Sequence, residues 1–132
     1  MLNLAVRAPV AVALGAIAGA LGRYYAGRWL TAAHGAGGFP VGTFAVNISG
    51  CLIMGLVIAL CDRFNVPPDV KLLLTTGALG AYTTFSTYSL ETLALLEQGR
   101  IRMAGLYWIG SAVLGLVALG LGSVLGGLGH RS

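Results

Sequence analysis

The sequence predicts an all-α membrane protein whose single domain, residues 1–132, contains four transmembrane helices. Composition is the first observation: 57% of the residues are hydrophobic. Only 9% are charged, against about 25% in an ordinary soluble domain. The second observation is the pattern, because four apolar stretches, each near the roughly 20 residues that cross a bilayer, fill most of the chain. The lipid bilayer is therefore the expected environment.

The four expected spans follow one another with short loops between them. The first covers residues 4–26; its lone Arg7 is a poor basic region for a signal peptide, and no clean cleavage site follows. The second covers residues 41–60, after a glycine-rich loop. The third covers residues 71–96, after a loop of turn-forming residues, and the fourth covers residues 103–128.

Small residues recur at helical spacing in the outer spans, which predicts a tight bundle that includes a partner chain. In the first span they are Ala11, Gly15, Gly19, Gly22 and Ala26, and in the fourth they are Ser111, Gly115, Ala118, Gly122 and Gly126.

The basic residues are divided almost evenly between the two sides of the membrane. One side receives Arg7, Arg63, Lys71 and Arg131, and the other receives Arg28, Arg100 and Arg102, with Arg23 near it. The positive-inside rule then gives almost no preferred orientation. This is either a weak topology signal or, as we favour, a sign of insertion in both orientations, which permits an antiparallel homodimer. No basic run is interleaved with aromatic residues, so no nucleic-acid partner is expected.

The third span carries seven Ser and Thr hydroxyls between Thr75 and Ser89. One helical face would contain Thr76, Gly80, Thr83, Thr84, Thr87 and Glu91. Lipid does not tolerate such a face, and intramembrane polar groups are commonly functional, so we favour a polar track. The alternative is that each hydroxyl bonds to a carbonyl of its own helix.

Two glycines, Gly77 and Gly80, weaken the third helix near its middle. A break there would free backbone carbonyls, which can hold a hard cation such as Na⁺. Close packing against another helix is an equally good explanation of the two glycines.

Other candidates allow two interpretations each. The amide of Asn47 is either a donor pair for a dehydrated anion or a link between helices. Arg23 either attracts anions into a vestibule or extends to the headgroups. Phe85 and Tyr88 are spaced i and i+3, so their electropositive ring edges either face an anion or simply pack.

Catalysis is not expected, because the sequence has no nucleophile–base pair and no cluster of metal ligands. Cys51 and Cys61 are about 15 Å apart along one predicted helix. They are therefore too distant to form a disulfide easily.

Three segments together resemble the Fluc family of bacterial fluoride channels: residues 77–88, 42–47 and 22–24. The resemblance implies an antiparallel, dual-topology homodimer in the bacterial inner (plasma) membrane, with two pores for passive fluoride export. It assigns pore roles to Asn47, Phe85, Tyr88, Thr84, Ser86 and Thr87, with Ser111 and Tyr107 on the fourth helix as weaker candidates. It also implies a vestibule role for Arg23, a third helix that is broken near its middle, and a structural, untransported Na⁺ at that break on the carbonyls of Gly80 and Thr83. Tyr88 stands where the family usually has Phe.

Two other functions compete with this one. A small proton-coupled drug exporter of four helices needs an intramembrane carboxylate, and Glu91 is the only acid within a span. A membrane assembly protein without transport activity would explain the small-residue faces, but not the hydroxyls together with Asn47.

Overall fold

The structure is a computed structural model that describes residues 4–34 and 38–128, and within these ranges it contains helices and no strands. Three long helices are α1 (Leu4–His34), α2 (Val41–Arg63) and α6 (Ile101–Gly127). Between α2 and α6 the chain forms a series of shorter elements: α3 (Pro68–Leu72), the π-helical η1 (Leu73–Leu79), α4 (Gly80–Tyr82) and α5 (Phe85–Glu97).

The three long helices are also long and apolar enough to cross a membrane, over Val6–Ala33, Val41–Arg63 and Ile101–Gly127. The first expected span, residues 4–26, lies within α1, which continues eight residues further because no proline and only Gly27 interrupt the sequence before His34. The second expected span lies within α2, and the fourth overlaps α6. Residues 71–96, the third expected span, do not form one continuous helix.

The predicted break in the third helix is confirmed, but it lies at Thr83 and Thr84 rather than at the glycines. Thr83 has ψ of 156°, and Thr84 has φ of −145° and ψ of 120°, so both residues are extended. Gly77 is instead buried against α1, where an added Cβ would lie 3.0 Å from the Cα of Gly15. The alternative of close packing is therefore correct for Gly77.

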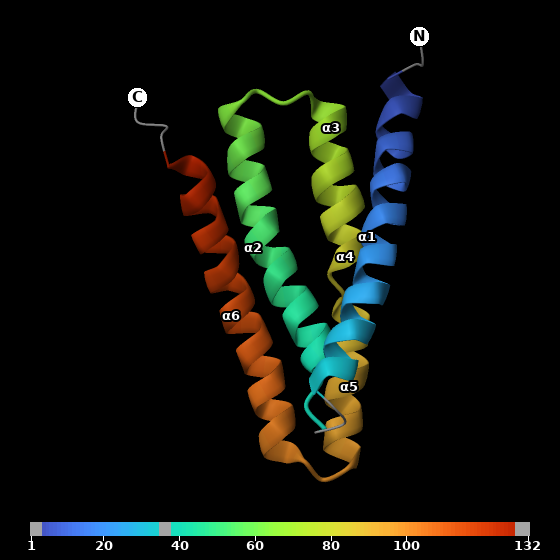
Figure 1. Ribbon diagram of the computed structural model, residues 1–132, viewed down its shortest axis with the longest axis vertical. Helices are drawn as coiled ribbons and strands as arrows, with labels where there is room; N and C mark the ends of the chain where they lie inside the picture. The colour runs from blue at the N-terminus through green and yellow to red at the C-terminus, as the bar shows by residue number, and fades with distance from the viewer. Residues whose placement is uncertain (1–3, 35–37, 129–132) are drawn as a thin grey trace.

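Successive segments run antiparallel, as Figure 1 shows. The start of α1 and the end of α6 lie at one end of the bundle, together with the α2–α3 loop; we call this the terminal end. The α5–α6 turn lies at the opposite end, which we call the turn end. The most extensive helix pairings are α2 with α6 and α1 with η1.

Glycine lets these helix pairs touch backbone to backbone. A Cβ added at Gly15 would overlap the carbonyl oxygen of Leu73, and one added at Gly122 would overlap that of Leu52. Helices of a membrane bundle gain dispersion energy from such close approach. The small-residue faces read from the sequence are thus packing surfaces.

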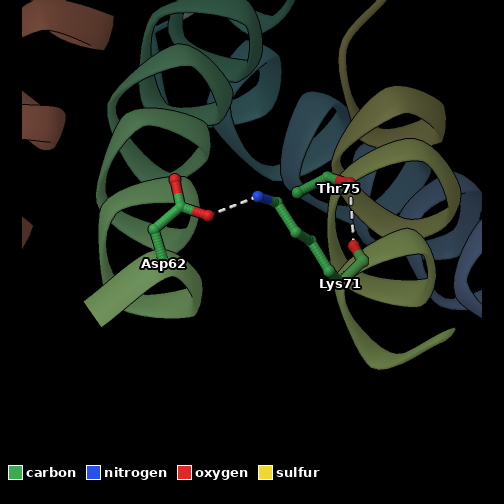
Figure 2. Close-up of polar contacts among 3 residues, drawn as sticks. All are labelled: Asp62, Lys71 and Thr75. Carbon is green, nitrogen blue, oxygen red and sulfur yellow. Dashed lines mark hydrogen bonds and ion pairs between the residues drawn. The ribbon is translucent and has the colours of Figure 1, made fainter. Parts of the chain in front are cut away.

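Ion pairs fix the loops of the terminal end. Lys71 Nζ lies 2.5 Å from Asp62 Oδ1, across the α2–α3 loop, and Thr75 Oγ1 donates to the carbonyl of Lys71 at 2.7 Å (Figure 2). Arg7 on α1 lies 2.6 Å from Asp69. These pairs connect α1, α2 and α3.

Towards the turn end the core is made of side chains rather than glycines. Its buried members are Tyr88, Leu95, Ala104 and Tyr107, with Phe39, Phe44 and Met103 packed around them. This aromatic cluster fills the space between α5 and α6. Cys51 and Cys61 are both free, as their spacing predicts.

Candidate functional site

The break in the third segment is held from α2 by the side-chain amide of Asn47. Its Oδ1 accepts a hydrogen bond from the backbone nitrogen of Thr84 at 2.8 Å. Its Nδ2 donates to the backbone oxygen of the same residue at 3.1 Å. A continuous helix would bond Thr84 N to the carbonyl of Gly80. Asn47 replaces that bond and stabilises the extended conformation.

A second polar side chain reaches the break from α1. Nη1 of Arg23 donates to the carbonyl of Thr83 at 3.4 Å. Arg23 is only partly exposed, so other parts of the bundle cover some of its side chain. The break is therefore bounded by one amide and one positive charge.

Six of the seven Ser and Thr hydroxyls between Thr75 and Ser89 fall into two groups. Thr75, Thr83 and Ser89 each donate to a carbonyl four residues earlier, which was the alternative to a polar track. Thr84 is instead the N-cap of α5, where its Oγ1 accepts from the backbone nitrogen of Thr87 at 3.3 Å. Oγ1 of Thr84 also lies 3.0 Å from the hydroxyl of Thr87 and 3.5 Å from that of Ser86. The three predicted track residues Thr84, Ser86 and Thr87 thus form one cluster at the start of α5.

Two cavities adjoin this cluster. One of about 350 Å³ is lined by residues that include Asn47, Thr84, Phe85, Tyr88 and Ser111. The other, of about 190 Å³, is lined by residues that include Arg23, Thr43, Thr84 and Thr87. Thr84 lines both, so the recess beside Arg23 and the larger, mainly apolar recess adjoin at the break.

The two aromatic residues at the start of α5 differ sharply in exposure. Phe85 is 78% exposed on this chain, whereas Tyr88 is 6% exposed. Their ring centroids are 5.7 Å apart, at an angle of 48°. The hydroxyl of Tyr88 donates to the carbonyl of Trp108 on α6 at 2.7 Å. That bond directs the hydroxyl towards α6 and fixes the ring at the cavity wall.

Ser111, also on α6, supplies the remaining predicted site residue. Its Oγ is buried and, among the described residues, is the one buried side-chain oxygen or nitrogen without a hydrogen-bond partner. Unpaired buried polar atoms are rare and commonly mark a ligand or water position. A hydroxyl donor is therefore available in the larger cavity.

One polar group near the site was not singled out as a site residue from the sequence. Glu91 accepts hydrogen bonds from Thr43 Oγ1 at 2.9 Å and from Tyr107 Oη at 2.7 Å. Tyr107 is fully buried. Two features of the sequence point to Glu91: it is the only acid within an expected span, and it lies one helical turn after Thr87. Its partners lie on two other helices, so spacing alone could not find them.

The carbonyl oxygens of Gly80 and Thr83 suit a hard cation by their chemistry. Gly80 is exposed on this chain, and its usual helical donor, Thr84 N, is bonded to Asn47. The carbonyl of Thr83 accepts from Arg23. Two oxygens are fewer than a hard cation ordinarily takes, so a complete set requires further ligands, such as the same pair from a second copy.

Comparison with known proteins identifies relatives across almost the whole chain. The sequence profile of the family described as "CrcB-like protein, Camphor Resistance (CrcB)" matches residues 10–123. A protein from Trichormus variabilis named "Fluoride-specific ion channel FluC" is 49% identical over 125 residues, 93% of this chain and 90% of the relative. Proteins of the same name from a Synechococcus and a Synechocystis are 44% and 46% identical, over 95% and 90% of this chain and 96% and 92% of their own lengths. The resemblance to the fluoride-channel family is confirmed.

Proposed function

The chain belongs to the family of CrcB-like proteins, whose curated relatives are named fluoride-specific ion channels, and from this premise we propose that it lets fluoride leave the bacterial cytoplasm passively. It is a multi-pass bacterial membrane protein of a fluoride-channel family. The weak acid HF enters cells and dissociates in a neutral cytoplasm, and the anion then leaves through the channel. The names of the relatives do not favour a proton-coupled drug exporter.

One observation supports this proposal most strongly: the 350 Å³ cavity gathers Asn47, Thr84, Phe85, Tyr88 and Ser111 beside the break. Fluoride is small and strongly hydrated, so a pore must replace its water with closely spaced donors. The unpaired hydroxyl of Ser111 is such a donor. The ring edges of Phe85 and Tyr88 add positive potential without a fixed charge that would trap the ion.

Arg23 serves in this proposal as the group that draws anions towards the break. It lines the smaller cavity together with the hydroxyl-bearing residues Thr84 and Thr87. Its positive charge raises the local concentration of anions, as charged vestibules do. Thr84, which lines both cavities, is the residue that an ion passing between them would meet.

We further propose four membrane crossings per chain and an antiparallel homodimer. The segment from α3 to α5 is the fourth crossing, and its broken backbone is acceptable at membrane depth only where it is buried or lines a cavity. Phe85 beside the break is largely exposed on the single chain, so a pore that uses its ring edge needs a second copy to enclose it. Adding two Lys residues after Ser132 should orient all chains alike and abolish activity. Mixing with a variant that carries two Lys residues beside Arg100 should restore it, and full activity of either variant alone would contradict the antiparallel dimer.

A structural Na⁺ at the centre of that dimer is the third part of the proposal. The carbonyls of Gly80 and Thr83 would hold it, and its charge would link the two copies at their breaks. Because the ligands are backbone atoms, Thr83→Ser should retain the site. Replacing Na⁺ by a large organic cation during prolonged dialysis should weaken the dimer, and a dimer indifferent to this exchange would count against the ion.

The direct test of the function is ion flux through the purified protein in liposomes. With a valinomycin-mediated K⁺ pathway to balance charge, we expect rapid efflux of fluoride and no measurable efflux of chloride. Equal efflux of both anions, or efflux of neither, would refute a fluoride-selective channel.

A further inference from the structure

A separate cavity lies at the turn end of the bundle, away from the break. It has a volume of about 570 Å³ and is lined at the α5–α6 turn by Arg100 and Arg102, with apolar side chains beside them. Those apolar residues are Phe39, Ile101, Met103 and Leu106. No acidic residue is among the lining residues. The cavity therefore combines two positive charges with an apolar wall.

At the opposite end of the bundle, Arg7 and Lys71 are each paired with an aspartate, and Arg63 donates to the carbonyl of Leu128 at 2.8 Å. At the turn end, Arg100 and Arg102 place two positive charges in the wall of one cavity, which suits an external anion.

Arg100 is held in place rather than extended freely towards solvent. Its guanidinium lies against Gly38, where an added Cβ would overlap it, and Gly38 has a φ of +83°. Gly99, next to Arg100 in the turn, has a φ of +72°. The α5–α6 turn therefore lies against Gly38, next to the cavity residue Phe39. Arg100 also lines a neighbouring cavity, whose wall includes Glu91. Arg102 lines only the 570 Å³ cavity, so it is the more specific position to substitute.

The position along the membrane identifies the class of anion. The candidate membrane span of α6 begins at Ile101, between the two arginines. This level is the boundary between hydrocarbon and headgroups, where lipid phosphates lie. Ile101 and Leu106 are 69% and 72% exposed, so an apolar surface continues from the cavity along α6 towards the hydrocarbon.

We propose that the cavity at Arg100 and Arg102 binds an anionic phospholipid, with its phosphate on the two guanidinium groups and an acyl chain on Ile101 and Leu106. Guanidinium groups match the geometry of phosphate oxygens. Basic pockets between transmembrane helices bind anionic headgroups in the same way. The site is independent of the fluoride pathway and present once per chain.

Native mass spectrometry of the purified full-length protein tests this proposal. The protein is titrated with phosphatidylglycerol and, separately, with phosphatidylcholine of identical acyl chains. We expect phosphatidylglycerol to be retained at least fivefold more tightly, at one copy per chain. Arg102→Gln should remove about a fivefold factor, the contribution of one basic residue at a membrane surface.

Arg28→Gln is the matched control, because Arg28 is exposed near the same end but lines none of the cavity. It should leave the preference unchanged, and Leu106→Ser should weaken retention of both lipids. Equal retention of the two lipids by the unaltered protein, or equal losses in Arg102→Gln and Arg28→Gln, would overturn the proposal. Displacement of phosphatidylglycerol by millimolar inorganic phosphate would also overturn it, since the site would then bind free phosphate.

Discussion

Two regions of this bundle are packed by opposite means. In the pairs α1–η1 and α2–α6, glycines bring backbones into contact, as at Gly15 against Leu73 and Gly122 against Leu52. Around α5, in contrast, helices are separated by large side chains, and Tyr107 meets Tyr88 with ring centroids 5.3 Å apart. The two cavities lined by candidate pore residues both adjoin this second region.

The difference shows how a short membrane chain can be both rigid and permeable. Backbone contact excludes space for an ion, so it serves only to fix the helices. Side-chain contact leaves recesses, and hydroxyl, amide and aromatic groups can then line them. Substitutions in the first region should therefore change stability, and substitutions in the second should change ion flux.

The largest effect is expected at Asn47, which lines a cavity beside the side-chain-packed region. Asn47→Asp removes the donor to the Thr84 carbonyl and places a negative charge on the proposed path. Two like charges about 4 Å apart repel by about 4 kcal/mol at an effective dielectric of about 20, which corresponds to a loss of about a thousandfold in anion occupancy. Fluoride efflux from liposomes should therefore fall below detection, while size-exclusion chromatography still shows a folded dimer. Normal efflux by that dimer would remove Asn47 from the pore.

A smaller loss of flux is expected from Phe85→Ile. Isoleucine keeps bulk and apolarity but removes the electropositive ring edge, and we expect efflux per dimer to fall about tenfold, the equivalent of about 1.4 kcal/mol. Phe64→Ile is the matched control, because Phe64 is also largely exposed but lies at the end of α2. If the rings only pack, Phe85→Ile will lower thermal stability and leave efflux per folded dimer unchanged.

The close-packed region should respond in stability alone. Gly122→Ala puts a Cβ onto the carbonyl of Leu52, and such overpacking costs about 1–3 kcal/mol. Gly120→Ala, on the same helix, meets nothing within 4 Å and should be neutral or slightly stabilising. Thermal unfolding in detergent compares the two. Similar melting temperatures would mean that the α2–α6 contact is not tight.

The smallest effect is expected from Tyr88→Phe, within the side-chain-packed region around α5. The change deletes only the hydroxyl, which donates to the Trp108 carbonyl, and should lower the free energy of unfolding by about 1 kcal/mol. Because the ring edge remains, fluoride efflux should stay within about twofold of the original. Tyr25→Phe, at an exposed tyrosine of α1, is the control for stability. A large loss of efflux in Tyr88→Phe would assign the hydroxyl itself to the pore.

The helical architecture and the existence of a break could be predicted from the sequence. The architecture depends on a local property, apolar runs of bilayer length. The break was expected from Gly77 and Gly80, but it lies at Thr83 and Thr84, which follow them. The position of the break could not be predicted, because Asn47 on another helix supplies the hydrogen bonds that replace the helical bond at Thr84. The packing role of Gly77 could not be predicted either, because the residues that it contacts lie on α1.

The polar track was predictable only in part, for the same reason. The spacing from Thr76 to Glu91 assumed one continuous helix, and the extended residues Thr83 and Thr84 interrupt it. Thr84, Ser86 and Thr87 still gather because they are close in sequence. Glu91 accepts hydrogen bonds from Thr43 and Tyr107, which lie on two other helices. The spacing of residues within one helix cannot predict such contacts.

The start of α1 and the end of α6 lie at the same end of the bundle (Figure 1), and this has a consequence for gene fusion. Two copies joined in tandem by a short linker would enter the membrane in the same direction. A fused pair with opposite directions would need a linker that itself crosses the bilayer, at a length of about 20 apolar residues. The proposed antiparallel pair can therefore form from two separate products of one gene without a linker, whereas a simple duplication cannot supply it.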